Sequence, residues 1–157
     1  MTKNNLLIFI TGILLSITSC NEKRIFEQYE EIDDAVWHAD SIITFSANIK
    51  DTVNPYDLFV HIRNSGKYSY SNLYLFITIK FPKTGSIHDT LECILADKKG
   101  KWLGKGFGGV WNNPIPYKKA IRFPRKGIYT FTIEQAMRKE KLPAILDVGL
   151  RIEQSKI

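Results

Sequence analysis

The chain has 157 residues, of which 44% are hydrophobic and 12% aromatic. This composition supports one ordinary domain with a real core, and it excludes a wholly disordered chain. The formal net charge of +6 points to an anionic partner without identifying one, and two cysteines exclude a disulfide framework.

A secretory-signal pattern occupies the first twenty residues. Lys3 lies in a short polar start, and a largely apolar run follows at 6–15. That run has the length of a signal-peptide hydrophobic region and is too short to span a bilayer comfortably. It ends in Ile17-Thr18-Ser19-Cys20, which resembles the bacterial lipobox, where the cysteine receives a diacylglyceryl group after cleavage just before it. We predict removal of residues 1–19 and lipidation of Cys20, with an ordinary signal peptide or a short anchor as the alternative.

Lipidation places the mature chain in the cell envelope. Each acyl methylene that enters a membrane contributes about 0.8 kcal/mol, so several acyl chains hold a domain there without a transmembrane helix. Asn21 follows the cysteine. This position lacks the aspartate that commonly retains lipoproteins at the inner membrane, which favours the outer membrane.

Residues 27–40 form an acidic stretch without Lys or Arg, with carboxylates at Glu27, Glu30, Glu31, Asp33, Asp34 and Asp40. Such a segment extends by self-repulsion and serves as a spacer from an anionic membrane. The alternative is a lead-in that packs along the domain and is pinned by Trp37. We assign residues 20–40 to a lipidated acidic tether and residues 41–157 to the folded domain.

Apolar and polar residues alternate in six later segments, at 42–49, 56–63, 73–80, 91–95, 129–133 and 146–153. This alternation is typical of half-buried antiparallel strands with one face on a core and the other in water. Cys93 falls on an apolar face, which makes it a small buried hydrophobe. Turn residues separate the segments, so we predict an all-β, antiparallel β-sandwich of the jelly-roll or Greek-key type.

One segment breaks the alternating pattern. Residues 134–141 are good helix formers, and Glu134 with Arg138 forms a favourable pair four residues apart. We therefore expect one short connecting helix that stops before Pro143.

Catalytic and metal-binding patterns are missing from the sequence. His38, His61 and His88 share no metal-ligand spacing, and no nucleophile elbow, HExxH or CxxC motif occurs. Residues 104–109 match GxGxxG, but the proline-containing residues 110–116 that follow cannot open a helix to hold a phosphate. We predict no catalytic residue, no metal site and no cofactor beyond the covalent lipid, which disfavours an enzyme.

The positive charge is concentrated between residues 98 and 141, where aromatic side chains are interleaved with lysines. Aromatic rings beside cations bind bases, sugars or acidic proteins. Export disfavours nucleic acid, so a glycan, a lipid headgroup or another protein remains, the alternative being a solvated cationic face with core tryptophans. The candidate binding residues are Lys101, Trp102, Lys105, Trp111 and Tyr117.

Several blocks in order resemble one known family: Tyr68-Ser69-Tyr70-Ser71-Asn72-Leu73, Gly100-Lys101-Trp102-Leu103-Gly104, Gln135-Ala136-Met137-Arg138 and Asp147-Val148-Gly149-Leu150-Arg151. The sequence is similar to GldH, a gliding-motility lipoprotein family, from Cys20 almost to the C-terminus. The resemblance implies an envelope lipoprotein required for gliding, in the company of the type IX secretion apparatus, and it supplies no ligand residues. The favoured hypothesis is therefore a membrane-tethered module that contacts other gliding and secretion proteins. The alternative is a glycan-binding lipoprotein that stacks sugars on Trp102, Trp111 and Tyr117.

Overall fold

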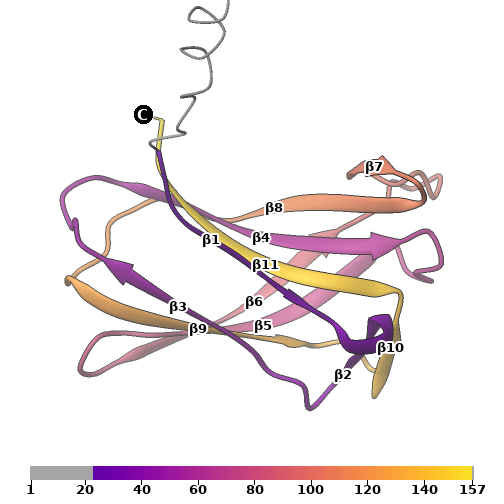
Figure 1. Ribbon diagram of the computed structural model, residues 1–157, viewed down its shortest axis with the longest axis horizontal. Coiled ribbons are helices and arrows are strands. Elements are labelled where there is room, and N and C mark those ends of the chain that lie inside the picture. Colours follow the sequence, from indigo (N-terminus) through magenta and orange to yellow (C-terminus); the bar gives the residue numbers. More distant parts are fainter. Residues whose placement is uncertain (1–22, 157) are drawn as a thin grey trace, which may run out of the picture.

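Two antiparallel sheets pack face to face and enclose the core (Figure 1). The computed structural model describes residues 23–156, so the predicted signal peptide and Cys20 lie outside the described part. The five-stranded sheet has the order β1-β11-β4-β8-β7, formed by Arg24–Glu31, Ile145–Gln154, Tyr56–Ser65, Val110–Ile121 and Lys105–Phe107. The four-stranded sheet has the order β3-β9-β5-β6, formed by Ile43–Ile49, Gly127–Gln135, Asn72–Lys80 and Ser86–Ile94. At one end, β2 (Val36–His38) pairs with β10 (Lys141–Pro143), next to the one-turn 3-10 helix η1 (Asp33–Ala35). The predicted all-β sandwich is confirmed.

All six alternating segments form strands, because their apolar faces meet between the sheets. In β3 every second residue from Ile43 to Ile49 is buried and the residues between are exposed. Cys93 is fully buried on β6, as its place on the apolar stripe predicts. The ring of Phe123 packs against Tyr129 at a centroid distance of 4.8 Å and closes one end of the core. Each fully buried large side chain contributes about 1.5–3 kcal/mol, so this alternation drives the two sheets together.

The predicted helix at 134–141 is wrong. Strand β9 runs on to Gln135, which lies opposite Leu75 of β5, and β10 begins at Lys141. The Gln135 side chain closes the turn between them, since its Nε2 donates to the Lys139 carbonyl at 2.7 Å and its Oε1 accepts from Met137 N at 2.9 Å. Cross-strand pairing with β5 and this side-chain bridge override the local helix propensity.

The described part of the acidic segment is packed into the domain. Its first strand, β1, pairs with β11 over almost its whole length, and Trp37 is fully buried with its Nε1 donating to the Ser41 carbonyl at 2.9 Å. Phe26 of β1 lies edge-on to Phe45 at 6.5 Å between ring centroids. Residues 24–38 pack along the domain, and the sheet structure begins at Arg24.

The sequence did not predict strand β8, because Pro114 and Pro116 are unfavourable in the interior of a strand. Strand β7 covers only Val110, Trp111 and Asn112 of β8. Beyond that point β8 is an edge strand on this side, and prolines are tolerated at a sheet edge because no neighbour requires their missing N–H.

Within residues 23–156 we find no helix whose length and hydrophobicity would carry it across a bilayer.

Candidate functional site

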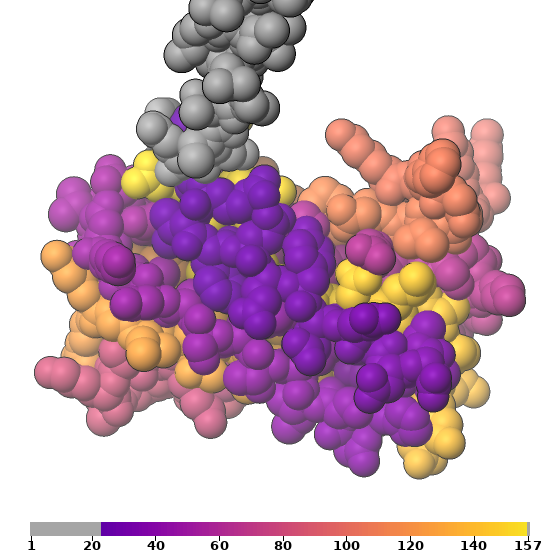
Figure 2. All heavy atoms as spheres, viewed as in Figure 1, coloured from indigo at the N-terminus to yellow at the C-terminus, as the bar shows by residue number. Residues whose placement is uncertain are grey.

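A tight hairpin joins β7 to β8 and carries the most exposed apolar side chain of the described residues. Phe107 is 95% exposed, and Leu103, just before β7, is 57% exposed. Gly108 and Gly109 form the two-residue turn with φ of 61° and 81°, the backbone of a type I′ hairpin turn. Figure 2 shows the segment around β7 standing out from the body of the domain.

A pair of tryptophans lies at the base of this hairpin. The rings of Trp102 and Trp111 are 5.6 Å apart at 35°, and Tyr68 packs beside Trp102 at 6.5 Å. Both tryptophans are half-buried, and Trp102 packs against the hydrophobic core. Gly106 makes room for the indole, because a Cβ there would lie 2.6 Å from Trp111 Cδ1.

The lysines of the predicted binding set lie close to this pair along the chain. Lys101 and Lys105 are exposed, the first at the end of a short turn and the second at the start of β7. Asp97 shapes the turn, since its Oδ1 accepts from the backbone N of Lys99 at 2.8 Å and of Lys101 at 2.9 Å. Four of the five predicted binding residues therefore belong to one basic, aromatic surface.

The fifth residue, Tyr117, lies elsewhere. It is six residues from Trp111 along the same strand, which at about 3.3 Å per residue places it roughly 20 Å away. Its hydroxyl donates to Asp89 Oδ2 at 2.6 Å, and Lys118 Nζ lies 2.8 Å from the same oxygen. Tyr117 therefore joins β8 to β6 across the two sheets, and the three aromatic residues do not form a single stacking platform.

The glycines of the GxGxxG match serve packing. A Cβ on Gly104 would lie 2.6 Å from Asn113 Oδ1. The amide of Asn113 is buried and donates to the Ile62 carbonyl at 3.1 Å and to Asn64 Oδ1 at 2.9 Å. The segment around Gly104 and Gly106 lies directly on Asn113 and Trp111, and the strand that follows confirms that no helix opens there.

The three histidines stay apart in the structure. His61 is only 3% exposed on β4, with its Nδ1 3.2 Å from the Tyr29 hydroxyl and 3.4 Å from Asn112 Oδ1. Burial, with Arg151 nearby, lowers the pKa of His61, so it is held neutral. His88 bonds to Thr78 on the outer face of the other sheet. Among residues 23–156, no three His, Cys, Asp or Glu side chains gather closely enough to hold a metal ion.

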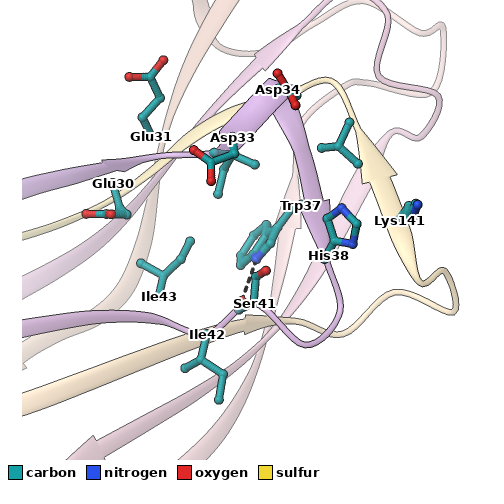
Figure 3. Close-up of a pocket in the computed structure, with 12 residues that line it drawn as sticks. Glu30, Glu31, Asp33, Asp34, Trp37, His38, Ser41, Ile42, Ile43 and Lys141 are labelled. Atoms are coloured by element: carbon teal, nitrogen blue, oxygen red, sulfur yellow. Dashed lines mark hydrogen bonds between the residues drawn. The ribbon is translucent and has the colours of Figure 1, made fainter.

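An acidic cleft of about 500 Å³ opens at the end of the sandwich where β1, η1, β2 and β3 meet (Figure 3). In Figure 3 the indole of Trp37 lies at its centre, with Glu30 and Asp33 on one side and Lys141 on the other. Ile42 lines the cleft and is 57% exposed. The cleft thus combines negative charge with an apolar wall, which suits a cationic segment that carries an apolar side chain.

Comparison with known proteins gives the decisive observation. The sequence profile described as GldH lipoprotein matches residues 24–152. The chain belongs to the GldH lipoprotein family. It is 44% identical to the "Gliding motility lipoprotein GldH homolog" of Christiangramia forsetii, over 94% of each chain. It is 37% identical to the "Gliding motility lipoprotein GldH" of Flavobacterium johnsoniae, over 97% of each chain. The predicted resemblance is confirmed.

Solved structures add no functional information. An infectious bursal disease virus structure, of the Gx strain, aligns with 83% of this chain and 30% of that one, at a TM-score of 0.36 and 13% identity. A TM-score of this size supports no argument about fold or function.

Two features of the surface escaped the sequence analysis. Phe107 was not singled out, although the Gly108-Gly109 pair after it is a type I′ turn signal that would have placed it at a hairpin tip. The acidic cleft had no local signal, because β1, η1 and β3 meet there only in the folded chain.

Proposed function

We propose that this GldH-family protein is a lipid-anchored, non-enzymatic interaction component of the gliding-motility and type IX secretion machinery. One observation carries the proposal: the family match extends from Arg24 of β1 to Ile152 of β11 and so includes the whole sandwich. The alignment with the gliding-motility relative of Flavobacterium johnsoniae covers 97% of each chain, which supports a shared role.

The anchor in this proposal is the lipid on Cys20. Three residue steps separate Cys20 from Lys23, the first described residue, and an extended chain covers about 3.4 Å per residue. The sandwich would then begin at most about 14 Å from the membrane surface, because β1 starts one residue later, at Arg24. Asn21 supports the outer membrane as its location.

The acidic cleft is the surface that we assign to a partner protein of the machinery. Glu30, Glu31, Asp33 and Asp34 line it together with apolar side chains, and it is open to solvent. A partner segment with lysine or arginine beside an apolar side chain complements this lining in both charge and polarity.

Gene replacement tests the proposed function. We expect this gene, in place of the related gene of Flavobacterium johnsoniae, to restore colony spreading and protein secretion. Cys20→Ala in the same strain should release the protein from the membrane fraction and abolish spreading. The proposal is refuted if the wild-type protein accumulates in the envelope at normal levels while spreading and secretion both remain absent.

A second set of variants tests the cleft. Asp34 has a φ of 52°, a conformation that asparagine tolerates well, so Asp34→Asn together with Glu31→Gln removes charge with little backbone strain. We expect less partner protein to co-purify from detergent-solubilised envelopes, together with reduced spreading. Glu134→Gln, on the outer face of the other sheet, is the matched control and should leave both unchanged. Equal effects of the two sets would remove the cleft from the proposal.

The half-exposed Trp102–Trp111 pair favours a glycan ligand as a second candidate. The solvent-exposed part of an indole pair can stack on a sugar ring. Titration of envelope oligosaccharides against the purified protein should quench tryptophan fluorescence, and a flat response with every oligosaccharide would eliminate this candidate.

A further inference from the structure

The tip of the β7–β8 hairpin exposes apolar surface that no other part of the described chain covers. Phe107 at the tip is 95% exposed and has glycine on both sides, and Leu103, just before β7 at the base of the hairpin, is 57% exposed. Exposed apolar side chains of this size are costly in water unless they contact something. Because the tip protrudes and is narrow, it offers a partner a small convex apolar surface instead of a groove.

Positive charge is concentrated in the segment of the chain that carries this apolar tip. Between residues 95 and 111 the cations are Lys98, Lys99, Lys101 and Lys105, and all four are exposed. Asp97 is the one carboxylate in that range, and its Oδ1 faces inward to accept two backbone N–H groups of its own turn. The tip thus presents cations to an approaching surface, and an anionic lipid layer attracts such a cluster.

The hairpin lies on the side of the molecule where the chain enters the domain. Figures 1 and 2 show the start of β1 and the β7 segment both at the top of the view, above the five-stranded sheet, with the four-stranded sheet below. Lys23 is fixed there, because its carbonyl accepts from Gln154 N at 2.7 Å. One flat surface above this sheet therefore meets both the N-terminal end of β1 and the hairpin.

We propose that the β7–β8 hairpin is a second membrane-contact site of this lipoprotein. It places Phe107 and Leu103 in the interface of an anionic bilayer, with the ammonium groups of the surrounding lysines among the lipid phosphates. Aromatic and aliphatic side chains flanked by snorkelling lysines are the composition that favours such an interface. The inference takes the direction of the bilayer from the proposed N-terminal anchor, and it does not depend on a role in gliding.

Contact at two points has a structural consequence. A single flexible anchor leaves a domain free to rotate over the membrane. A second contact on the same sheet fixes its orientation, so that the four-stranded sheet faces away from the bilayer.

Site-specific labelling tests the proposal on the protein purified from detergent-extracted envelopes. A polarity-sensitive thiol dye is placed at Phe107→Cys and, as a matched control, at Phe76→Cys. Phe76 is 52% exposed on the four-stranded sheet, on the layer away from the hairpin. Cys93 stays unlabelled because it is fully buried. Each labelled protein is incorporated into vesicles of phosphatidylcholine alone or with about 30% phosphatidylglycerol.

We expect nitroxide-labelled lipids to quench the dye at position 107 several-fold more than the dye at position 76. Quenching should be stronger in the anionic vesicles and should weaken in about 0.5 M salt, where surface charges are screened. Adding Lys99→Glu and Lys105→Glu should reduce it further. The proposal is overturned if aqueous iodide reaches both positions equally in both kinds of vesicle. It is also overturned if position 107 is protected in native envelopes but not in protein-free vesicles, which would assign the tip to a protein partner.

Discussion

Gly149 and Tyr29 offer a sharp test of how β1 is held on the sheet. Gly149 of β11 lies between Tyr29 on β1 and His61 on β4, and the tyrosine ring leans across it to reach His61. A Cβ at Gly149 would lie 2.6 Å from Tyr29 Cδ1. Real Cβ atoms do not approach so closely, so Gly149→Ala must displace the ring and break its 3.2 Å contact with His61 Nδ1.

Gly149→Ala is expected to change the free energy of unfolding in opposite directions in the wild-type protein and in the Tyr29→Ala variant. Overpacking costs about 1–3 kcal/mol. Replacing a strand glycine of ordinary φ by alanine stabilises by about 0.5–1 kcal/mol. Gly149→Ala should therefore destabilise the wild-type protein by about 1–2 kcal/mol, whereas in the Tyr29→Ala background, where the ring is gone, it should stabilise the protein.

Urea unfolding of the wild type, the two single variants and the double variant measures this coupling. The transition midpoints should shift while the denaturant slope stays the same, because the exposed surface hardly changes. A Gly149→Ala penalty of equal size with and without Tyr29 would refute the packing argument and place the effect in the β11 backbone instead.

Three further predictions concern single sites. Tyr117→Phe should destabilise the domain by about 1 kcal/mol at neutral pH. The neighbouring Lys118 ion pair and the Tyr117 hydroxyl keep the pKa of Asp89 below the usual range of an aspartate, so this loss should persist at neutral pH and shrink only in acid below that range, where Asp89 protonates. The Cys93 thiol, whose pKa burial raises to about 12, should react with thiol reagents only after denaturation, and fast reaction of the folded protein would contradict its place in the core. Gly106→Ala should push Trp111 outward and shift its fluorescence to longer wavelength, and an unchanged spectrum would show that the hairpin yields instead.

Strand positions followed from the sequence wherever one face of a strand meets the core. Residues such as Leu73 and Leu75 alternate cleanly because every second side chain of β5 is buried. Strand β1 lacks this alternation, because it is an edge strand with most of its residues exposed. Its pairing with β11 depends on residues more than a hundred positions away and leaves no local pattern.

The candidate binding residues also include some that the sequence could group and one, Tyr117, that only the structure could place. The lysines and tryptophans of residues 98–111 were identified from composition, and the structure groups the two tryptophans at one hairpin, while binding by this set stays a prediction. Tyr117 was assigned to the same group because β8 was not recognised as a strand. Once β8 is extended, six residues carry Tyr117 roughly 20 Å away from Trp111, to the carboxylate of Asp89.

By itself, the sequence determined the two-sided strands, the buried Cys93 and membership of the GldH lipoprotein family. The tertiary structure alone decided that the acidic residues after Cys20 form an edge strand and one wall of a cleft. It also decided that residues 134–141 form no helix and that the hairpin tip lies on the same side as the start of β1. The physical reason is that alternation reports the burial of one residue at a time, whereas strand pairing and the position of a hairpin are set by contacts between segments distant in the chain.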